Sequence, residues 1–545
     1  MPETPSVGAV TKVERRRVYL AVWLTAWLFA LLVQVPGMGT VDSLRRLQVT
    51  RSWGTDEPAV RVSDRADFGM PGREGVWQAW YGPGQSWLMW PADLIARSAE
   101  RFVPNSALKF KFSSALVATL TFPPLVATTV LLVFVWLGQL GFLPLQRLAG
   151  AFSLLLASSH LYYTQVHMEN SLQVFLLVLD AVCLGRWMVT GQKKWLVVSA
   201  GTAAWALNIR VPALADHGGL WLAALAVLYF RRPRPDEGGA VGWQALRWAQ
   251  LVGVAVPILL VGLLLDRWYQ WHRFGTWAGT YITEFARHQR TKNLTLSPAF
   301  PFDGDFWEGL LGPLISPTRG IVFSDPLMLV LVVLLLTRWR RLGRPVQALL
   351  LGLGLGFASL VFFYARVSFW NGSTTWGNRY TLTPIHGLTA LVLPLWLRHV
   401  LPGRWWTRHL LPTVLLAAMA VQVSSILLPS SVEDQLPAAS VGPLIPLARV
   451  ANALGVVMGE AAPPPVNPED WRLNLFPGTL GMVVPRLKWA LWAVWWMGLG
   501  LAGWMLGRSY RLASRWDGTI EVYEDDRRAD WWPDLALDRE ADPGE

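Results

Sequence analysis

The sequence predicts an all-α protein that crosses a membrane about twelve times. Of its 545 residues, 53% are hydrophobic and only 16% are charged. Apolar runs of roughly 18 residues recur along the chain, which is the length that spans a bilayer as a helix. Many of the 33 Trp lie at the edges of these runs, as in Trp405-Trp406 and Trp495-Trp496, where amphipathic rings anchor helices at the headgroup level. This composition excludes an ordinary soluble domain.

The apolar runs follow one another from near residue 18 to near residue 506. The first run has a basic flank like that of a signal peptide, but it is long and no small-x-small cleavage site follows it, so we expect it to remain as a span. The runs that begin at Gly218 and Pro326 are short for a span. In chain order the predicted spans are Val18–Pro36, Phe112–Trp136, Arg147–Tyr163, Ser171–Met188, Trp195–Pro212, Gly218–Phe230, Trp248–Leu265, Pro326–Thr337, Val346–Tyr364, Leu382–Leu397, His409–Leu428 and Leu487–Leu506.

The basic residues of the short loops predict the orientation. Lys and Arg of short loops stay on the cytoplasmic side, which places residues 1–17 and a tail of residues 507–545 in the cytoplasm. The long loops 38–111, 266–325 and 429–486 then face outward. The basic groups that agree are Arg15-Arg16-Arg17, Arg147, Lys193-Lys194, Arg231-Arg232, Arg338 to Arg344, Arg404 with Arg408, and Arg508 with Arg511.

The first outer loop is expected to contain helices that lie in the membrane interface. Val41–Trp53 and Gln85–Arg97 carry apolar residues at helical spacing, together with Trp rings suited to the interface. Turn residues at Asp56-Glu57-Pro58 and Tyr81-Gly82-Pro83-Gly84 separate them.

Two other classes are disfavoured. The net charge of +11 comes from residues dispersed among short loops, so it reflects membrane orientation and does not predict nucleic-acid binding. The single cysteine, Cys183, lies in an apolar run. It cannot form an intramolecular disulfide, and no neighbouring base suggests thiol catalysis.

Asp42 is the first candidate for catalysis. It follows the first span by a few residues and opens a predicted helix. One interpretation is an N-cap, because an aspartate there accepts backbone N–H bonds. The other adds a general base, which must be ionised and near the acceptor. Arg45 and Arg46, three and four residues later, share its helix face and could hold it ionised or bind a phosphate.

Glu169 is the second acidic candidate. It lies at the outer end between the third and fourth predicted spans, where a carboxylate also complements a helix dipole. His160, His167 and Glu169 could be written as metal ligands, but their spacing matches no specific zinc or manganese pattern. The sequence therefore establishes no cofactor and leaves a divalent metal open.

Three arginines lie at predicted outer helix ends, where topology does not call for cations. Arg210 ends an apolar span, so it either snorkels to headgroups or has a functional role. Arg319 and Arg379 each precede a span. Because the guanidinium fork matches phosphate oxygens, we expect the three to bind phosphate if the fold brings them together.

Several short motifs, taken together, resemble bacterial members of the GT-C glycosyltransferases, of the aminoarabinose-transferase and protein-mannosyltransferase kind. The likeness covers residues 18–428 and leaves 429–486, 487–506 and 507–545 unmatched. One difference is that Asp42 is followed by Ser43, whereas many relatives carry an adjacent acidic pair there. The motifs are Asp42 after the first span, Tyr81-Gly82-Pro83-Gly84-Gln85-Ser86, Ser316-Pro317-Thr318-Arg319-Gly320 with Pro326 after it, and Trp370-Asn371-Gly372 running to Trp376-Gly377-Asn378-Arg379-Tyr380.

The resemblance implies a function. It implies a GT-C-like transmembrane catalytic region that transfers a sugar, with inversion, from a polyprenyl-phosphate donor to a lipid, glycan or protein acceptor. Asp42, with Glu169 as the second acid, would serve catalysis, and Arg45, Arg46, Arg210, Arg319 and Arg379 would bind the donor phosphate. The site would face the periplasm or exterior from the cell inner membrane. A ligase or polymerase of lipid-linked oligosaccharides and a transporter or flippase of a lipid-linked sugar remain as alternatives.

Overall fold

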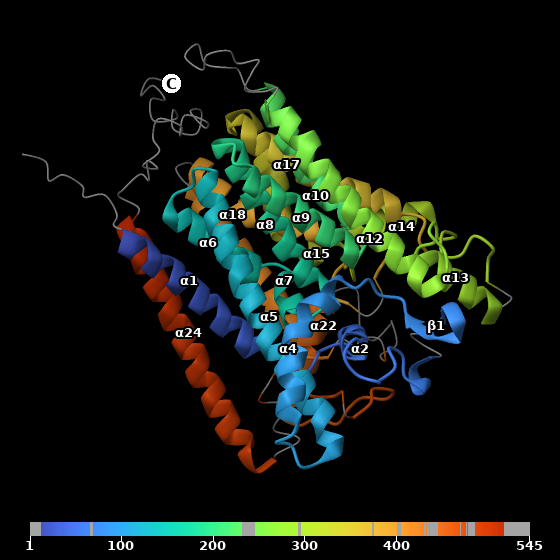
Figure 1. The fold of residues 1–545 in the computed structure, drawn as a ribbon. Coiled ribbons are helices and arrows are strands. Elements are labelled where there is room, and N and C mark those ends of the chain that lie inside the picture. The colour runs from blue at the N-terminus through green and yellow to red at the C-terminus, as the bar shows by residue number, and fades with distance from the viewer. Residues whose placement is uncertain are drawn as a thin grey trace, which may run out of the picture.

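The fold is a bundle of long helices with a smaller helical and hairpin layer at one end (Figure 1). The computed structural model describes residues 12–65, 69–230, 246–292, 296–372, 375–400, 405–429, 445–468, 470–475 and 485–516, with 432, 435 and 477. Residues 293–295, most of the 429–486 loop between its described pieces and the tail after 516 lie outside them.

Seven helical segments in the described residues are long and apolar enough to cross a membrane. Five other predicted runs fall in helices that are shorter or less apolar, so the protein is an all-helical membrane protein with seven clear candidate spans. The clear candidates are α1 (Lys12–Val33), α5 (Ser106–Gln139), α8 (Glu169–Thr190), the segment Leu246–Phe274 with η3 (Leu251–Ala255) and α12 (Val256–Phe274), α17 (Arg344–Tyr364), α19 (Trp405–Leu427) and α24 (Lys488–Trp516). The others are α6 (Pro144–Leu156), α9 (Lys193–Ile209), α10 (Ala213–Phe230), α16 (Leu327–Arg338) and α18 (Leu382–His399).

The predicted run Arg147–Tyr163 is not one helix. It divides into α6 and the short α7 (His160–Val166). At the break, the Ser158 hydroxyl donates to the Leu154 carbonyl at 2.6 Å, and the Ser159 backbone N–H donates to the Asp325 carboxylate at 2.7 Å. Because these side chains give the backbone partners outside the helix ladder, the chain can turn between α6 and α7 without leaving these groups unpaired.

Close packing of small residues joins α10 to α17. A Cβ atom on Gly219 would lie 2.2 Å from the carbonyl oxygen of Gly352. Only a residue without a side chain allows the two backbones to approach so closely, as is usual where membrane helices pack.

The first and last clear candidate spans lie together at one edge of the bundle, where α1 and α24 run side by side (Figure 1). The Trp495 indole donates to the Leu32 carbonyl at 2.8 Å, and the hydroxyls of Thr25 and Ser509 are 3.3 Å apart. The last span is therefore part of the same bundle as the first.

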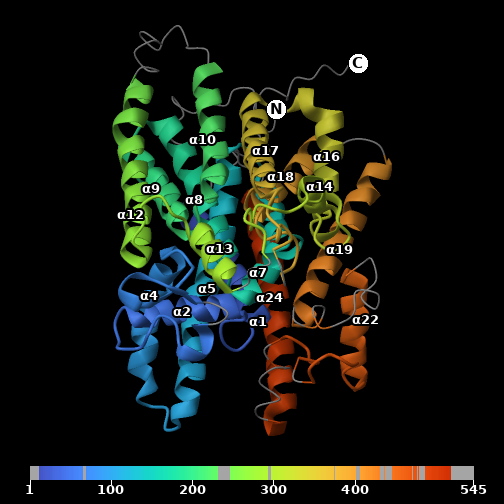
Figure 2. The same cartoon turned by 90° about the vertical axis from the view of Figure 1, so that its right-hand side faces the viewer.

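The layer at one end is built mainly from the first long loop, and Figure 2 shows it at the lower end of the bundle, below α9 and α12. We call this the α2 end. Its helices α2 (Val41–Ser52) and α4 (Gly84–Glu100) confirm the two predicted for this loop. Between them β1 (Gly69–Pro71) and β2 (Trp77–Ala79) form an antiparallel hairpin, which was not predicted.

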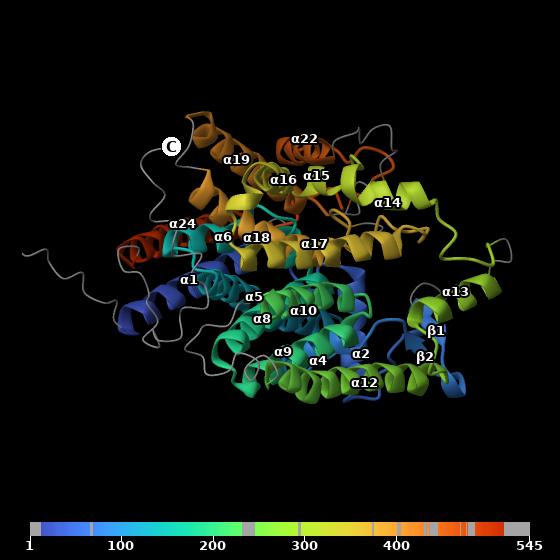
Figure 3. The same ribbon diagram turned by 90° about the horizontal axis from the view of Figure 1, so that it is seen from above.

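Later segments of the chain complete the α2 end. Figure 3, which views the bundle from above, shows α13 (Tyr281–Lys292) beside the hairpin and beyond the end of α12.

The elements not yet named are distributed along the whole chain. They are η1 (Val62–Asp64), η2 (Arg73–Gly75), α14 (Phe306–Ile315), α15 (Ile321–Ser324), η4 (Trp339–Arg341), α22 (Ile445–Met458) and η5 (Pro485–Leu487).

Candidate active site at the α2 end of the bundle

Asp42 lies in the first turn of α2 but is not its cap. Thr40 is the N-cap, and its hydroxyl accepts a hydrogen bond from the backbone N–H of Ser43 at 3.3 Å. The Asp42 carboxylate instead accepts one hydrogen bond from the Tyr81 hydroxyl at 2.7 Å and one from Nη1 of Arg379 at 2.9 Å. The cap interpretation of Asp42 is therefore wrong, because the helix terminus is satisfied by another residue.

The start of α2 is fixed against the turn between α7 and α8. His167 in that turn has a left-handed backbone with φ 56°. Its carbonyl oxygen accepts hydrogen bonds from the Ser43 hydroxyl and the Gln85 amide, each at 2.8 Å. One carbonyl thus holds the beginnings of both α2 and α4, and with them the positions of Asp42 and the Tyr81 turn.

The Tyr81 turn packs on the end of α9. A Cβ atom on Gly82 would lie 2.4 Å from the carbonyl oxygen of Asn208, and one on Gly84 would lie 2.5 Å from the Ile209 side chain. The glycines are needed here because the turn approaches another backbone. They place the Tyr81 ring beside α2.

Arg46 lies next to Asp42 and is almost fully buried. Its Nη2 lies 2.9 Å from the Glu169 carboxylate, and its guanidinium carbon is 4.2 Å from the centre of the Tyr81 ring. A buried cation needs such partners. Its Nη1 is buried and has no hydrogen-bond partner among the described residues, so one donor remains for a ligand oxygen.

Arg379 reaches Asp42 from a loop that precedes α18. The backbone of this loop accepts two hydrogen bonds: Asn170 donates to the Arg379 carbonyl at 2.8 Å, and Arg210 donates to the Tyr380 carbonyl at 3.1 Å. Arg210 also donates to the hydroxyl of Tyr364, at the end of α17, at 3.2 Å. The rings of Tyr364 and Tyr380 are stacked, with centroids 4.6 Å apart. These contacts fix the direction in which Arg379 points.

Arg319 holds the same loop at an earlier point. It donates to the Thr375 carbonyl, and the Tyr163 hydroxyl donates to the Trp376 carbonyl at 2.9 Å. The structure therefore brings Arg210, Arg319 and Arg379 to one loop, although the first two bind its main chain. Of the three, Arg379 contacts the Asp42 carboxylate.

Arg45 turns away from Asp42. Its guanidinium pairs with both oxygens of Asp64, at 2.6 Å for Nη2 and Oδ1. Two neighbouring residues on one helix face thus serve different partners, because the loop after α2 brings a carboxylate to only one of them.

The charges around Asp42 favour its ionised form. Burial alone would raise the pKa of this carboxyl, but the positive charges of Arg379 and Arg46 and the hydrogen bonds from Tyr81 and Arg379 outweigh it and lower the pKa below its ordinary value. Burial and the Asp42 charge raise the pKa of Tyr81 well above its usual range, so its hydroxyl stays a donor. The side chains of Asp42 and Arg379 are 22% and 19% exposed, so solvent reaches the pair.

The described residues contain no group of three or more His, Cys, Asp or Glu side chains suited to a metal ion. The three residues considered for one do not meet: His167 lies against Gln34 at 3.2 Å, His160 faces His386 with ring centroids 5.3 Å apart, and Glu169 pairs with Arg46.

The sequence did not predict that the side chains of three residues would take part in the site: Tyr81, Tyr380 and Asn170. Tyr81 and Tyr380 stand inside quoted motifs, but there the glycines and the arginine drew the argument. Asn170 directly follows Glu169, and its contact with residue 379 depends on the fold. The usable signal was a polar aromatic residue within each motif.

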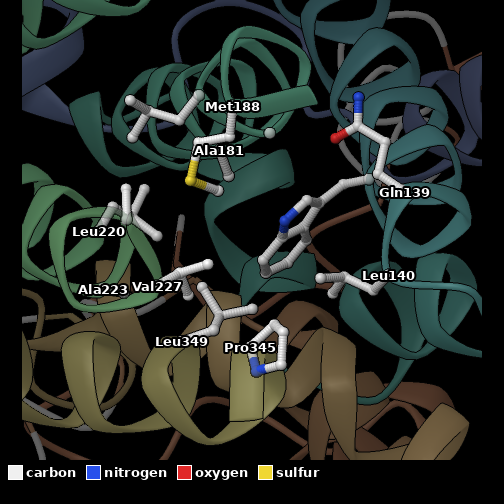
Figure 4. Close-up of a pocket in the computed structure, with 13 residues that line it drawn as sticks. Gln139, Leu140, Ala181, Met188, Leu220, Ala223, Val227, Pro345 and Leu349 are labelled. Carbon is white, nitrogen blue, oxygen red and sulfur yellow. The ribbon is translucent and has the colours of Figure 1, made fainter. Parts of the chain in front are cut away.

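A pocket at the opposite end of the bundle is not part of this site (Figure 4). It is lined by α5, α8, α10 and the start of α17, mostly by apolar side chains such as Met188, Leu220 and Leu349, with Gln139 at its edge. Glu169 and Met188 lie near opposite ends of α8, roughly 28 Å apart at the rise of an α-helix. Its lining offers no ionisable group for catalysis.

The chain is similar to one solved structure. No protein-family model matches it, and no curated protein matches it. The crystal structure of ArnT from Cupriavidus metallidurans bound to undecaprenyl phosphate shares 15% sequence identity with it, at a TM-score of 0.43, over 92% of this chain and 78% of that one. What the site of this chain can do follows from its own residues.

Proposed function

We propose that this protein is an integral membrane glycosyltransferase that moves a sugar from a polyprenyl-phosphate donor to an acceptor at the outer face of the membrane. The observation that carries the proposal is the contact of Asp42 with Arg379 and Tyr81, beside Arg46 and at the end of the membrane helices. An ionised carboxylate and cations side by side suit a proton acceptor next to an anionic leaving group.

Asp42 is the general base of this proposal. With its pKa lowered, it is ionised at neutral pH and can accept the proton of an acceptor hydroxyl or amine. The acceptor oxygen or nitrogen attacks the anomeric carbon of the donor, the bond from that carbon to the phosphate oxygen breaks, and the configuration inverts.

Arg46 and Arg379 are the phosphate ligands of this proposal. Nη1 of Arg46 and Nε of Arg379 are without hydrogen-bond partners among the described residues, and their charges would stabilise the phosphate as it leaves. Arg210 and Arg319 support the loop that carries Arg379. Arg45 secures α2 through Asp64, and Glu169 orients Arg46.

The proposal includes the arrangement in the membrane. The loops that carry Asp42 face outward, about twelve helices span the bilayer, and residues 18–428 form the catalytic region. The acceptor is a lipid, glycan or protein, and the donor tail stays in the bilayer beside the helices. No nucleic acid takes part.

A transfer assay tests the proposal. The purified protein in lipid is given a panel of radiolabelled polyprenyl-phosphate sugars, with membrane extracts as acceptors, beside the variants Asp42→Asn and Asp56→Asn. Asp56 is an exposed carboxylate of the same loop and serves as the matched control.

We expect label to reach an acceptor with the wild type and with Asp56→Asn. Loss of a general base costs about 10²–10⁴-fold, so Asp42→Asn should be reduced at least about 100-fold while keeping its thermal stability. Wild-type turnover by Asp42→Asn would remove Asp42 from the mechanism. Movement of the unchanged donor across the bilayer would identify a transporter instead, and transfer of a whole oligosaccharide from a lipid pyrophosphate would identify a ligase.

A further inference from the structure

Arg273, in the last turn of α12, is a buried cation that the reaction above does not use. It is 2% exposed, and its guanidinium carbon lies 4.1 Å from the centre of the Tyr269 ring and 4.8 Å from that of Phe274. Removing a cation from water costs free energy, which close contacts with the protein must offset. The contacts that Arg273 makes therefore indicate what it is there to hold.

Its hydrogen bonds go to the segment that leads into the Tyr81 turn. Nη1 donates to the carbonyl oxygens of Ala79 and Tyr81, the latter at 2.9 Å, and Nη2 donates to the Gln270 side chain at 3.1 Å. Ala79 is the last residue of β2. Arg273 thus fixes the backbone on either side of Trp80, and it fixes the backbone of Tyr81 itself.

The same region of the chain supports the hairpin at two further places. The rings of Trp80 and Phe285 meet edge to face with centroids 4.7 Å apart, and those of Trp77 and His288 meet at 5.9 Å. Phe285 and His288 lie on α13. Helices α12 and α13 therefore hold a hairpin that comes much earlier in the chain. The two Arg273 hydrogen bonds span 192 and 194 positions.

The hydroxyl of Tyr81 in turn donates to Oδ1 of Asp42 at 2.7 Å, while Arg379 holds Oδ2. We infer that Arg273 is a positioning residue for the proposed base: by clamping the Tyr81 carbonyl it keeps the Tyr81 hydroxyl on Oδ1 of Asp42, which sets both the aim and the ionisation of that carboxylate. The inference rests on the proposed role of Asp42.

Two variants and one control test this chain of contacts. Tyr81→Phe removes only the hydroxyl, and Arg273→Met removes the donors while keeping most of the side-chain length. Arg287→Met, on the neighbouring helix α13, is the control, because the Arg287 side chain is 68% exposed and pairs with Glu284 of its own helix. The measurements are the pH profile of kcat, the KM for the donor, and the pH dependence of Asp42 modification by a water-soluble carbodiimide, followed by mass spectrometry.

A hydrogen bond to a charged group favours that charged form. Without it we expect the acid limb of kcat and the pH midpoint of carbodiimide modification to move up by about one pH unit in both variants. The donor KM should change less than twofold, because the phosphate ligands are untouched. Arg287→Met should keep the wild-type profile.

The two readouts separate this inference from the proposed function. Unchanged acid limbs and unchanged modification midpoints in Tyr81→Phe, with active protein, would overturn the inference and leave the transferase proposal standing. If the wild type transfers no sugar but both variants still move the modification midpoint, Arg273 positions Asp42 and the proposed reaction is wrong. A shift in Tyr81→Phe but not in a folded Arg273→Met would overturn the role of Arg273.

Discussion

At the scale of residues, the site joins side chains that are far apart in sequence. Asp42 and Arg379 are separated by 337 positions and form one ion pair that solvent reaches. Because the two side chains are only 22% and 19% exposed, water and salt screen the Arg379 charge weakly at Asp42. Its main effect is on the ionisation of Asp42.

Removal of Arg379 tests that effect through pH. In Arg379→Ala the strongest lowering influence on the pKa of Asp42 is lost while burial still raises it. The rate requires the ionised carboxylate, which is present above its pKa and lost as pH falls through it. We therefore expect the acid limb of kcat to move to higher pH than in the wild type, and the donor KM to rise at least about tenfold from the loss of a charge-assisted contact.

The measurements are the pH profile of the transfer assay at saturating donor and the donor KM from assays at varied donor concentration. Arg366→Ala is the control, since Arg366 is an exposed arginine between α17 and the same loop. An unchanged acid limb together with an unchanged donor KM would assign Arg379 to the support of the loop alone.

The sequence predicted which residues would lie at helix ends, but it did not predict which of them would contact one another. Position in the chain identified Asp42, Arg210, Arg319 and Arg379 as polar groups at helix ends. It could not distinguish Arg45 from Arg46, because both share the helix face and only the fold brings Asp64 to one and Glu169 to the other. Contacts between residues hundreds of positions apart leave no periodic signal in a single sequence.

At the scale of elements, the site depends on how closely the Tyr81 turn approaches the end of α9. Hydrophobic periodicity predicted α2 and α4 correctly, because each has a buried and an exposed face. It did not predict the hairpin between them, since strands of three residues are too short to show alternation. The break between α6 and α7 was missed because the run is mostly apolar, and Ser158 and Ser159 at the break do not by themselves predict a helix end.

A glycine substitution tests the approach of the turn. In Gly82→Ala the new Cβ atom would lie 2.4 Å from the Asn208 carbonyl oxygen, so the turn must move away from α9 and carry the Tyr81 hydroxyl off Asp42. We expect a loss of stability of about 1–3 kcal/mol from overpacking and a fall in kcat larger than the change in donor KM. Thermal unfolding in detergent and the transfer assay measure the two effects.

Gly201→Ala is the matched control, because Gly201 lies within α9 and its Cβ would meet nothing within 4 Å. Alanine favours a helix interior by about 0.5–1 kcal/mol over glycine, so this variant should be as stable as the wild type or slightly more so, with full activity. A Gly82→Ala protein that behaves in the same way would show that the turn does not need its close contact with α9.

At the scale of the whole molecule, the function depends on which side of the membrane the α2 end faces. The basic short loops predict the outer side. Labelling of single cysteines tests this directly, since the chain has one native cysteine, Cys183, which is buried in α8 and can be replaced by alanine. Glu57→Cys places a thiol after α2, at a side chain that is 46% exposed.

Lys194→Cys provides the opposite face. Lys194 is exposed at the start of α9, whereas Ile209 at the other end of that helix meets Gly84, so the two ends differ by about 25 Å along the bundle. In intact cells a membrane-impermeant maleimide should label Glu57→Cys, and it should label Lys194→Cys only after permeabilisation. The reverse pattern would put Asp42 and Arg379 in the cytoplasm, where an outward-facing lipid-linked donor could not reach them, and the proposed reaction would fail on topology even if every contact in the site were correct.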